Sequence, residues 1–269
     1  MEDSLNREKP EVRLRAFRAI DEPETCELFI LGHTHVLTSI GVTKVTSSKN
    51  EWTRNPAAFV LIVESLDRKR VYGGARVHVA GGSEPLPLEQ ATAAMDPSVF
   101  DLVWKYAQNG TGELCGLWNS REIAGYGIGS IFLIRAAVAI SLQLGIRSLF
   151  ALCAPYTIKP VAAVGMELEK SIGNGGTFYY PKLDLVATTM LLKDVPTIIK
   201  ADLEDKEAIF KIRETWNIMR EEVLRNKKIM INYELEIPGL DKWDLAATIA
   251  NAHKTFLSHT IEESNINFL

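Results

Sequence analysis

The chain has 269 residues, 46% of them hydrophobic, enough for one sizeable core or one domain with a smaller addition. Lys and Arg number 30 against 34 Asp and Glu, so the net charge of -4 provides no basic surface for nucleic acid. Three scattered cysteines rule out a disulfide framework and lack metal-ligand spacing, which predicts a reducing cytoplasmic location and no metal. Residues 1–17 lack the apolar run of a secretory signal, and glycines and Arg135 interrupt residues 123–144 too often for a membrane span.

The first part of the sequence predicts a strand, a helix and an antiparallel hairpin. A short periodic stretch within residues 1–20 indicates an arm or a first strand, and apolar spacing predicts a helix between residues 23 and 40. Residues 58–64 and 71–79 are rich in β-branched side chains and flank a charged turn, which is typical of a hairpin. Gly73 and Gly74 in its second strand indicate a bulge or the close approach of something bulky. One or two helices follow between residues 88 and 109.

The central stretch, residues 112–166, organises the rest of the chain. It predicts a strand (113–120), a glycine-rich turn (124–130), a long apolar helix (131–144), a strand (148–154) and a short helix (158–164). Strands at 177–180 and 185–192 complete what we interpret as a core module, residues 1–195.

Residues 196–269 are interpreted as a C-terminal extension built from a helix, a strand and a helix. The first helix is expected at 204–226, because apolar residues recur there every three or four positions, and a strand with alternating polarity is expected at 229–237. The apolar positions of that first helix are Ile209, Ile212, Trp216, Met219 and Val223. The last helix is expected at 243–257. The extension could cap one side of the core, pair with a sheet edge or form a subunit contact, so a homodimer is left open.

The glycine-rich turn has the sequence AGYGIGS and leads directly into a helix. Glycines permit close approach of a ligand to the backbone, and the unpaired amides of a first helical turn favour an anion. A dinucleotide fingerprint would need a third glycine at Ser130, and a kinase-type P-loop would need a lysine at the end of the turn; neither is present. The turn indicates a cradle for a pyrophosphate or phosphopantetheine group, unless Ser130 simply caps the helix.

Residues 124–166 resemble the carrier-binding core of the GNAT acyltransferase superfamily, in which Arg/Gln-x-x-Gly-x-Gly/Ala begins a helix. Gly127 and Gly129 match the two small residues, whereas Ala124 stands where the family has Arg or Gln. The resemblance implies an α/β (α+β) fold with a mixed, mostly antiparallel sheet, two splayed central strands and flanking helices. It also implies that the turn holds the phosphates of acyl-CoA or acyl carrier protein through the residues Gly125, Tyr126, Gly127, Ile128, Gly129 and Ser130.

The segments NPAAFVLIV, VYGGARV and LWNSRE resemble a narrower group, the acyl-homoserine lactone synthases and related N-acyl amino acid synthases. That group carries Gly-x-x-Arg on one strand and Ser-Arg at the end of the next, and Arg76 and Arg121 match these arginines. Trp118 stands where those synthases have a glutamate. The likeness covers roughly residues 25–195. It implies that Arg76 binds an acidic acceptor and Arg121 a carrier phosphate, although either arginine could instead pair with a structural carboxylate.

Transfer of an acyl group from a thioester to an amine needs a deprotonated amine, a polarised carbonyl and a proton for the departing thiolate. Splayed strands would leave the backbone of Leu117, Trp118 and Asn119 free to hold the carrier and the thioester carbonyl. Simple alternation places Leu117 on the face of Glu113 and Trp118 on the opposite face.

Glu113 or Glu122 is the candidate base for the amine. Tyr156 is the candidate acid for the thiolate, since the position of the superfamily's usual tyrosine is Val161 here. We expect Cys115 and Cys153 to be buried core thiols rather than nucleophiles.

The sequence therefore predicts a GNAT-type N-acyltransferase that moves an acyl group from acyl-CoA or acyl carrier protein to a small amine such as an amino acid. Two alternatives stay open. One is an acetyl-CoA-dependent N-acetyltransferase. The other is a module that binds an acyl carrier or ligand without turnover.

Overall fold

The computed structural model describes residues 11–39, 50–120, 129–180, 184–224 and 226–266, with side chains described up to residue 258. The strands are β1 (Glu11–Arg18), β2 (Ala58–Glu64), β3 (Val71–Val79), β4 (Thr111–Asn119), β5 (Ser148–Cys153), β6 (Glu167–Leu168), β7 (Thr177–Tyr180), β8 (Leu185–Leu192), β9 (Asn217–Leu224) and β10 (Lys227–Glu234). The helices are α1 (Pro23–Ser39), α2 (Pro87–Thr92), α3 (Val99–Ala107), α4 (Ser130–Gln143), α5 (Pro155–Ala163), α6 (Leu203–Glu214) and α7 (Leu245–Ile266).

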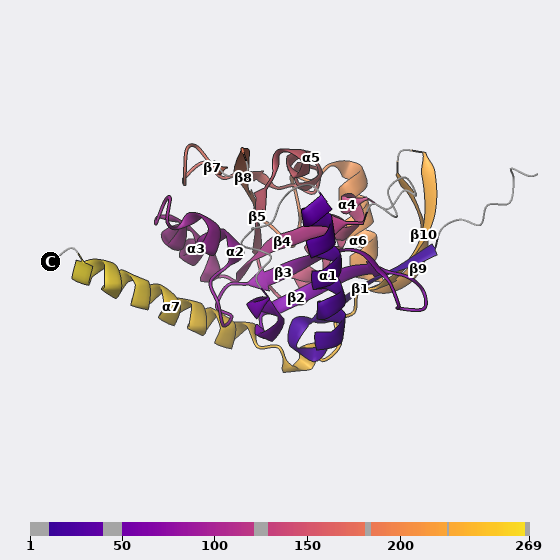
Figure 1. Ribbon diagram of the computed structural model, residues 1–269, viewed down its shortest axis with the longest axis horizontal. Helices are drawn as coiled ribbons and strands as arrows, with labels where there is room; N and C mark the ends of the chain where they lie inside the picture. Colours follow the sequence, from indigo (N-terminus) through magenta and orange to yellow (C-terminus); the bar gives the residue numbers. More distant parts are fainter. Residues whose placement is uncertain (1–10, 40–49, 121–128, 181–183, 225, 267–269) are drawn as a thin grey trace, which may run out of the picture.

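Within these ranges all the strands join one sheet (Figure 1). Its order is β6-β8-β5-β4-β3-β2-β1-β10-β9, and β7 pairs with β8 beside this path. Neighbouring strands run antiparallel except in the β4–β5 and β1–β10 pairs, which are parallel. This confirms the predicted mixed, mostly antiparallel sheet flanked by helices, and it also confirms the predicted hairpin of β2 and β3.

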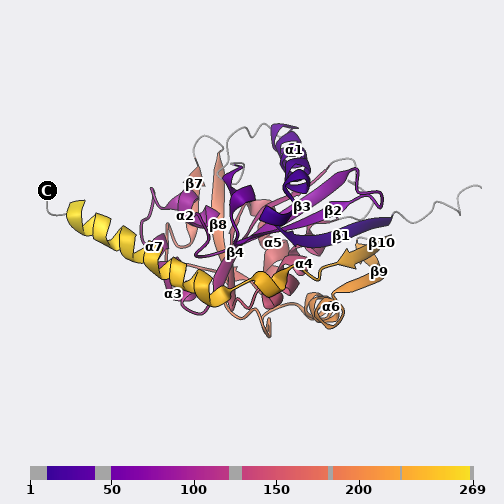
Figure 2. The same cartoon turned by 90° about the horizontal axis from the view of Figure 1, so that it is seen from below.

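Helices cover both faces of the sheet, with α1 on one side and α4, α5 and α6 on the other (Figure 2). Helix α4 lies at the centre of the larger core, and its residues 132–141 are all buried, as expected for a helix that is apolar almost all round. Its one buried charge is neutralised, because Arg135 Nε donates to Asp205 Oδ1 of α6 at 2.7 Å. No helix in the described ranges is both long and apolar enough to cross a membrane.

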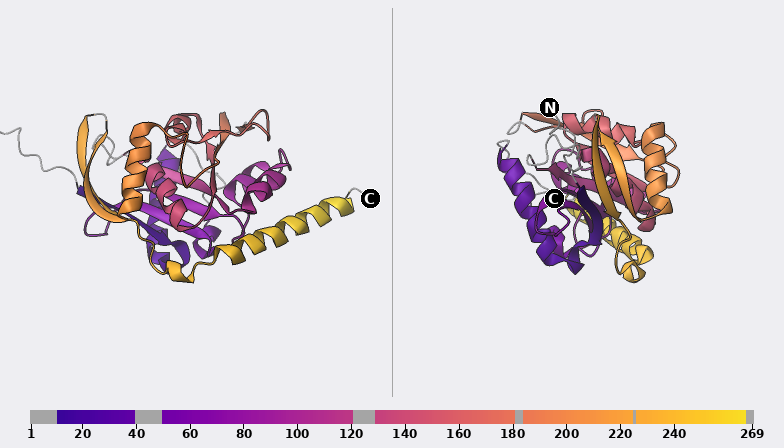
Figure 3. Two further views of the ribbon diagram at one scale, coloured as in Figure 1. Left: turned by 180° about the vertical axis from the view of Figure 1, so that it is seen from behind. Right: turned by 90° about the vertical axis from the view of Figure 1, so that its right-hand side faces the viewer.

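The prediction of one helix over residues 204–226 is wrong in its second half. Helix α6 ends at Glu214, and residues 217–224 form β9, which pairs along its whole length with β10 (Figure 3). Met219 and Val223, assigned to the buried stripe, are 53% and 52% exposed. The sequence of β9 does not show the usual alternation of apolar and polar residues, because the most buried side chain of the strand is Glu222. This carboxylate accepts a hydrogen bond from the Tyr233 hydroxyl at 3.0 Å.

The C-terminal segment is built into the same sheet as the rest of the chain. Strand β10 pairs in parallel with β1, the first described strand, and Ile231 joins Leu14 in the larger hydrophobic core. Of the three arrangements left open for this segment, the structure thus shows pairing with the sheet edge. The division at residue 195 stays a proposal about the organisation of the sequence, and a homodimer stays a prediction.

Candidate active site

Strands β4 and β5 are hydrogen-bonded neighbours at one end only. Their register covers three pairs and ends with Glu113 opposite Phe150. Beyond this point β4 stays with β3 as far as Asn119, and β5 stays with β8 as far as Cys153. The two strands therefore diverge after Glu113, which confirms the predicted splay in the middle of the sheet.

A β-bulge at Gly116 changes the face of the sheet on which the following side chains of β4 lie. Gly116 has φ of +58°, a left-handed conformation that glycine adopts without the strain a side chain would add. Across the bulge β4 uses one residue more than β3. Leu117 consequently packs against the core around α4, whereas Trp118 packs under α1. The predicted alternation is wrong beyond the bulge, since Trp118 and not Leu117 shares the face of Glu113.

The free end of β4 is tied to the beginning of α4. The Asn119 side-chain amide lies 2.9 Å from Ser130 Oγ. With the amide turned so that its oxygen faces the helix, that oxygen also accepts from Ser130 N at 3.2 Å. Gly129 precedes the helix, and a Cβ there would lie 2.3 Å from Leu224 Cδ2 of β9. The structure thus brings three predicted carrier-binding residues together at the N-terminus of α4, close to β9.

Six other predicted site residues lie outside the described residues. They are Arg121, Glu122, Gly125, Tyr126, Gly127 and Ile128. Their assignment to carrier binding, and that of Glu122 to catalysis, stays a prediction.

Glu113 is buried at the point where the strands part. Its side chain is 2% exposed, and Oε2 accepts a hydrogen bond from the Leu88 amide of α2 at 2.6 Å. Burial raises the pKa of Glu113 to about 8, and the nearby Glu89 carboxylate adds to the rise, whereas the Leu88 hydrogen bond and Arg76 oppose it. Glu113 is therefore mostly a neutral carboxylic acid at pH 7, and once ionised it is a stronger base than an ordinary carboxylate.

His78 stands directly opposite Glu113 in the β3–β4 register and is also buried. Burial, followed by the charge of Arg76, holds the pKa of His78 well below its usual value, so the imidazole is neutral. None of the described residues forms a hydrogen bond with its Nε2. The sequence analysis did not select His78, although the two-residue repeat of β3 places it on the face of Arg76.

Arg76 lies among aromatic rings beneath α1. Its side chain is 1% exposed, and its guanidinium carbon lies 4.4 Å from the Trp52 ring centroid and 5.8 Å from that of Phe29. Burial lowers the pKa of Arg76 from its usual value. Phe29 also contacts Trp118 edge to face, with ring centroids 5.7 Å apart. Phe29 and Trp52 were missed because loops and strands separate them from the arginine in the sequence.

Helix α1 and strand β4 fit together through one glycine. A Cβ on Gly32 of α1 would lie 2.2 Å from the Trp118 ring, so the indole occupies the space that a side chain would need. Phe29 similarly lies 2.4 Å from where a Cβ of Gly74 would stand. The expectation of a close approach at Gly73 and Gly74 is thereby confirmed: the neighbour at Gly74 is Phe29, and a Cβ at Gly73 would lie 2.4 Å from Asn119 Oδ1.

Tyr156 and the cysteines occupy contrasting environments. Tyr156 lies in the first turn of α5, just beyond the end of β5, and is 75% exposed. Cys26, Cys115 and Cys153 are buried free thiols, and burial raises the pKa of each to about 12. This confirms Cys115 and Cys153 as core thiols. In the part of the chain that the structure describes, no three His, Cys, Asp or Glu side chains are grouped to hold a metal ion.

Comparison with known proteins adds an independent observation. No protein-family model matches the chain, and the search of curated proteins found no match. Among solved structures, FeeM, an N-acyl amino acid synthase from uncultured soil microbes, superposes with a TM-score of 0.54 at 15% identity, covering 74% of this chain and 98% of its own. BjaI, a CoA-dependent acyl-homoserine lactone synthase solved with SAM and isopentyl-CoA, gives a TM-score of 0.52 at 10% identity, covering 90% and 99%.

This chain has the fold of those synthases. The likeness extends over almost the whole length of each matched protein, so the expected fold is confirmed. At these identities the comparison establishes the architecture, and the activity must be argued from the site.

Proposed function

We propose that this protein is an N-acyltransferase that moves an acyl group from a thioester carrier to a small amine such as an amino acid. The observation that carries the proposal is the parting of β4 and β5 after Glu113. Elsewhere in the sheet, the backbone N–H and C=O groups of neighbouring strands bond to each other. Where two strands separate, a linear, amide-bearing arm such as pantetheine can form hydrogen bonds with those groups instead. In this protein that gap opens beside a buried carboxyl group.

The donor is proposed to be acyl-CoA or acyl carrier protein, with its phosphates at the glycine-rich turn before α4. Helix N-termini favour anions, and Gly129 and Ser130 begin this helix. The backbone of Leu117, Trp118 and Asn119 on the diverging part of β4 would hold the carrier arm and the thioester carbonyl. BjaI, a CoA-dependent enzyme of the same fold, supports a CoA thioester as donor.

The reaction needs one proton removed and one supplied. The amine nitrogen attacks the thioester carbonyl carbon, a C–N bond forms, the C–S bond breaks, and the thiolate leaves with the electron pair. The Glu113 carboxylate takes the proton that the amine loses, directly or through water, and Glu122 is the alternative base. Tyr156 or solvent protonates the thiolate, and the exposed position of Tyr156 requires the carrier to approach the end of β5.

The acceptor is proposed to be an amine with an acidic group, because Arg76 is a buried cation on the face of Glu113 and close enough to lower the pKa of Glu113. FeeM, an N-acyl amino acid synthase of the same fold, supports an amino-acid acceptor. Trp118 replaces the glutamate of the acyl-homoserine lactone synthases, which favours a product different from theirs. Acetyl transfer from acetyl-CoA and carrier binding without turnover remain the alternatives, distinguished by the assay below.

The direct test is thiol release from CoA and carrier-protein thioesters of increasing chain length, with a panel of amines and amino acids. Amine-dependent release is expected, and its chain-length optimum separates fatty from acetyl donors. Absence of amine-dependent release from every thioester, in protein that binds them, would establish a binding module instead.

Ser130→Glu tests the phosphate site while leaving the helix intact. An acidic residue in the first turn stabilises a helix but repels phosphate, so KM for the thioester should rise at least about tenfold. Ser130→Gln is the matched neutral control and should change KM far less. Equal effects of the two substitutions would place the phosphates elsewhere.

A further inference from the structure

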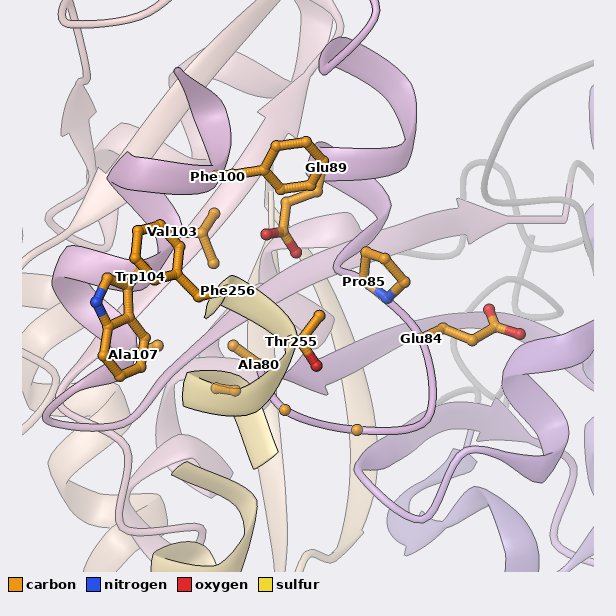
Figure 4. Close-up of a pocket in the computed structure, with 13 residues that line it drawn as sticks. Ala80, Glu84, Pro85, Glu89, Phe100, Val103, Trp104, Ala107, Thr255 and Phe256 are labelled. Carbon is orange, nitrogen blue, oxygen red and sulfur yellow. The ribbon is translucent and has the colours of Figure 1, made fainter. Parts of the chain in front are cut away.

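A cavity lies between α2, α3 and the middle of α7 (Figure 4). Its walls come from the loop at residues 80–85 and from α2, α3 and α7. It offers about 40 Å³ to the centres of water-sized molecules. One buried water needs roughly 10–15 Å³ on this measure, so there is room for a few waters or for a small organic ion.

Three aromatic rings form much of the wall, those of Phe100, Trp104 and Phe256 (Figure 4). Trp104 of α3 stacks on Phe256 of α7 with ring centroids 5.3 Å apart and an interplanar angle of 16°. Trp104 also stacks on His253 of α7, with ring centroids 4.9 Å apart and an interplanar angle of 11°. These stacked rings pack α7 against α3.

One carboxylate points into the cavity. Figure 4 shows the Glu89 carboxylate directed toward the space between the rings, whereas that of Glu84 points away from it. Glu89 Oε2 accepts one hydrogen bond, from the Leu86 amide at 2.7 Å. These two glutamates are the charged residues among the 13 that line the cavity, so no lining cation balances Glu89. When Glu89 is ionised, no cation among the lining residues balances its charge, and a positively charged ligand could do so.

We propose that this cavity binds a small alkylammonium cation, with the Glu89 carboxylate as counter-ion and the rings of Phe100, Trp104 and Phe256 as walls. Aromatic faces attract organic cations through their quadrupoles, most strongly where water is excluded. An anion would be repelled by Glu89, and a neutral apolar ligand would leave the carboxylate desolvated without compensation. The proposal uses none of the residues assigned to acyl transfer, although Glu89 is close enough to Glu113 to raise the pKa of that residue.

The binding should depend on pH through Glu89. Burial raises the pKa of Glu89 to about 7, so the cation competes with a proton and its affinity should increase as pH rises through that value. The other titratable groups that face Glu89 or its pocket are Glu113 on β4, Glu84 in the loop and His253 on α7. The charged residues of α3, Asp101 and Lys105, are exposed on its outer side.

Calorimetric titration of the full chain with methylammonium, trimethylammonium and tetramethylammonium tests the proposal, with tert-butanol as a neutral analogue of similar size. Saturable ammonium binding is expected at about pH 8.5, with affinity about tenfold lower at about pH 6, and none is expected for tert-butanol. Absence of saturable ammonium binding at the higher pH, or equal binding of tert-butanol, would overturn the proposal.

Matched substitutions identify the responsible carboxylate. Glu89→Gln keeps an oxygen that can accept from Leu86, so the helix start should persist while ammonium binding and its pH dependence disappear. Glu84→Gln, which removes the carboxylate that points away, should retain both. His253→Gln should retain the pH dependence, which separates Glu89 from the histidine. Undiminished ammonium binding by folded Glu89→Gln protein would also overturn the proposal. If that variant fails to fold, the pH dependence of ammonium binding by the unmodified protein tests the role of Glu89.

Discussion

Glu113 and Phe150 form the last rung between β4 and β5, and the strands separate immediately beyond them. The Glu113 carboxyl group is buried, and within the described residues it accepts a hydrogen bond from one main-chain amide, that of Leu88 in α2. Its protonation state is therefore coupled both to the stability of the fold and to any chemistry at the split.

The contribution of Glu113 to the stability of the protein should fall as pH rises from about 4.5 to about 8. Burial raises the pKa of Glu113 from 4.5 to about 8, so the folded protein holds the proton more tightly than the unfolded chain. This contribution is fully present below about pH 4.5 and is lost as pH rises through about 8. Urea denaturation across this range should show a flatter pH dependence for Glu113→Gln. An identical slope in both proteins would contradict the raised pKa.

Acyl transfer should require the ionised form of Glu113. The pH profile of kcat/KM should rise with an apparent pKa near 8, and Glu113→Gln should lower kcat by about 100-fold and remove that rise. If the variant keeps the rising limb, another group is the base, and Glu122→Gln becomes the next variant to measure.

Gly116→Ala should destabilise the protein more than Gly175→Ala. Both glycines have nearly the same left-handed φ, +58° and +61°, so both substitutions carry the same backbone strain of about 1–2 kcal/mol. A Cβ at Gly116 would also lie 2.8 Å from Arg76 Nε, whereas none of the described atoms lies within 4 Å of a Cβ at Gly175. Chemical denaturation of the two variants measures the difference. Equal losses would mean that Arg76 moves aside without cost.

Gly32→Ala should cost about 1–3 kcal/mol of the free energy of unfolding, because the new methyl group overlaps the Trp118 ring. Trp118→Leu in the Gly32→Ala background should recover part of this loss by making room. A double-mutant cycle measures the coupling. Additive effects of the two substitutions would show that the contact between α1 and β4 is loose.

Asp205→Ala should cost about 3–5 kcal/mol, since it leaves the Arg135 guanidinium buried between α4 and α6 without its nearest carboxylate. The double variant Arg135→Met with Asp205→Leu should regain most of that stability by replacing the ion pair with apolar contact. Urea denaturation checks both. A small loss for Asp205→Ala would indicate that Glu204, 3.3 Å from Arg135 Nη2, is a sufficient partner.

Local patterns predicted the strands and helices around the site, because β-branched runs and apolar periodicity are encoded within a few residues. They did not predict the bulge at Gly116, because a glycine inside a strand is compatible with straight alternation until its φ is known. For that reason alone, the predicted side of the sheet for Trp118 was wrong.

Local sequence patterns did not predict the contacts between segments that are far apart in the chain. Strand β9 was taken for a helix because its inward side chains include Arg220 and Glu222, which pair with each other at 3.5 Å and hide the apolar alternation. The cavity at Glu89 was not anticipated, because its aromatic wall joins α3 to α7, far apart in the chain. The splay of β4 and β5 was expected from the family resemblance, and the two-residue period alone would not have shown it.

The parallel pairing of β1 with β10 has a consequence for biosynthesis. Strand β1 leaves the ribosome before β10, the strand that covers its second edge, and most of the described elements lie between the two in the sequence. Until residues 227–234 have been released, β1 presents an open edge on which another nascent polypeptide could add. Chaperone protection during translation would therefore matter most for this edge, and messages truncated before residue 227 should yield aggregates.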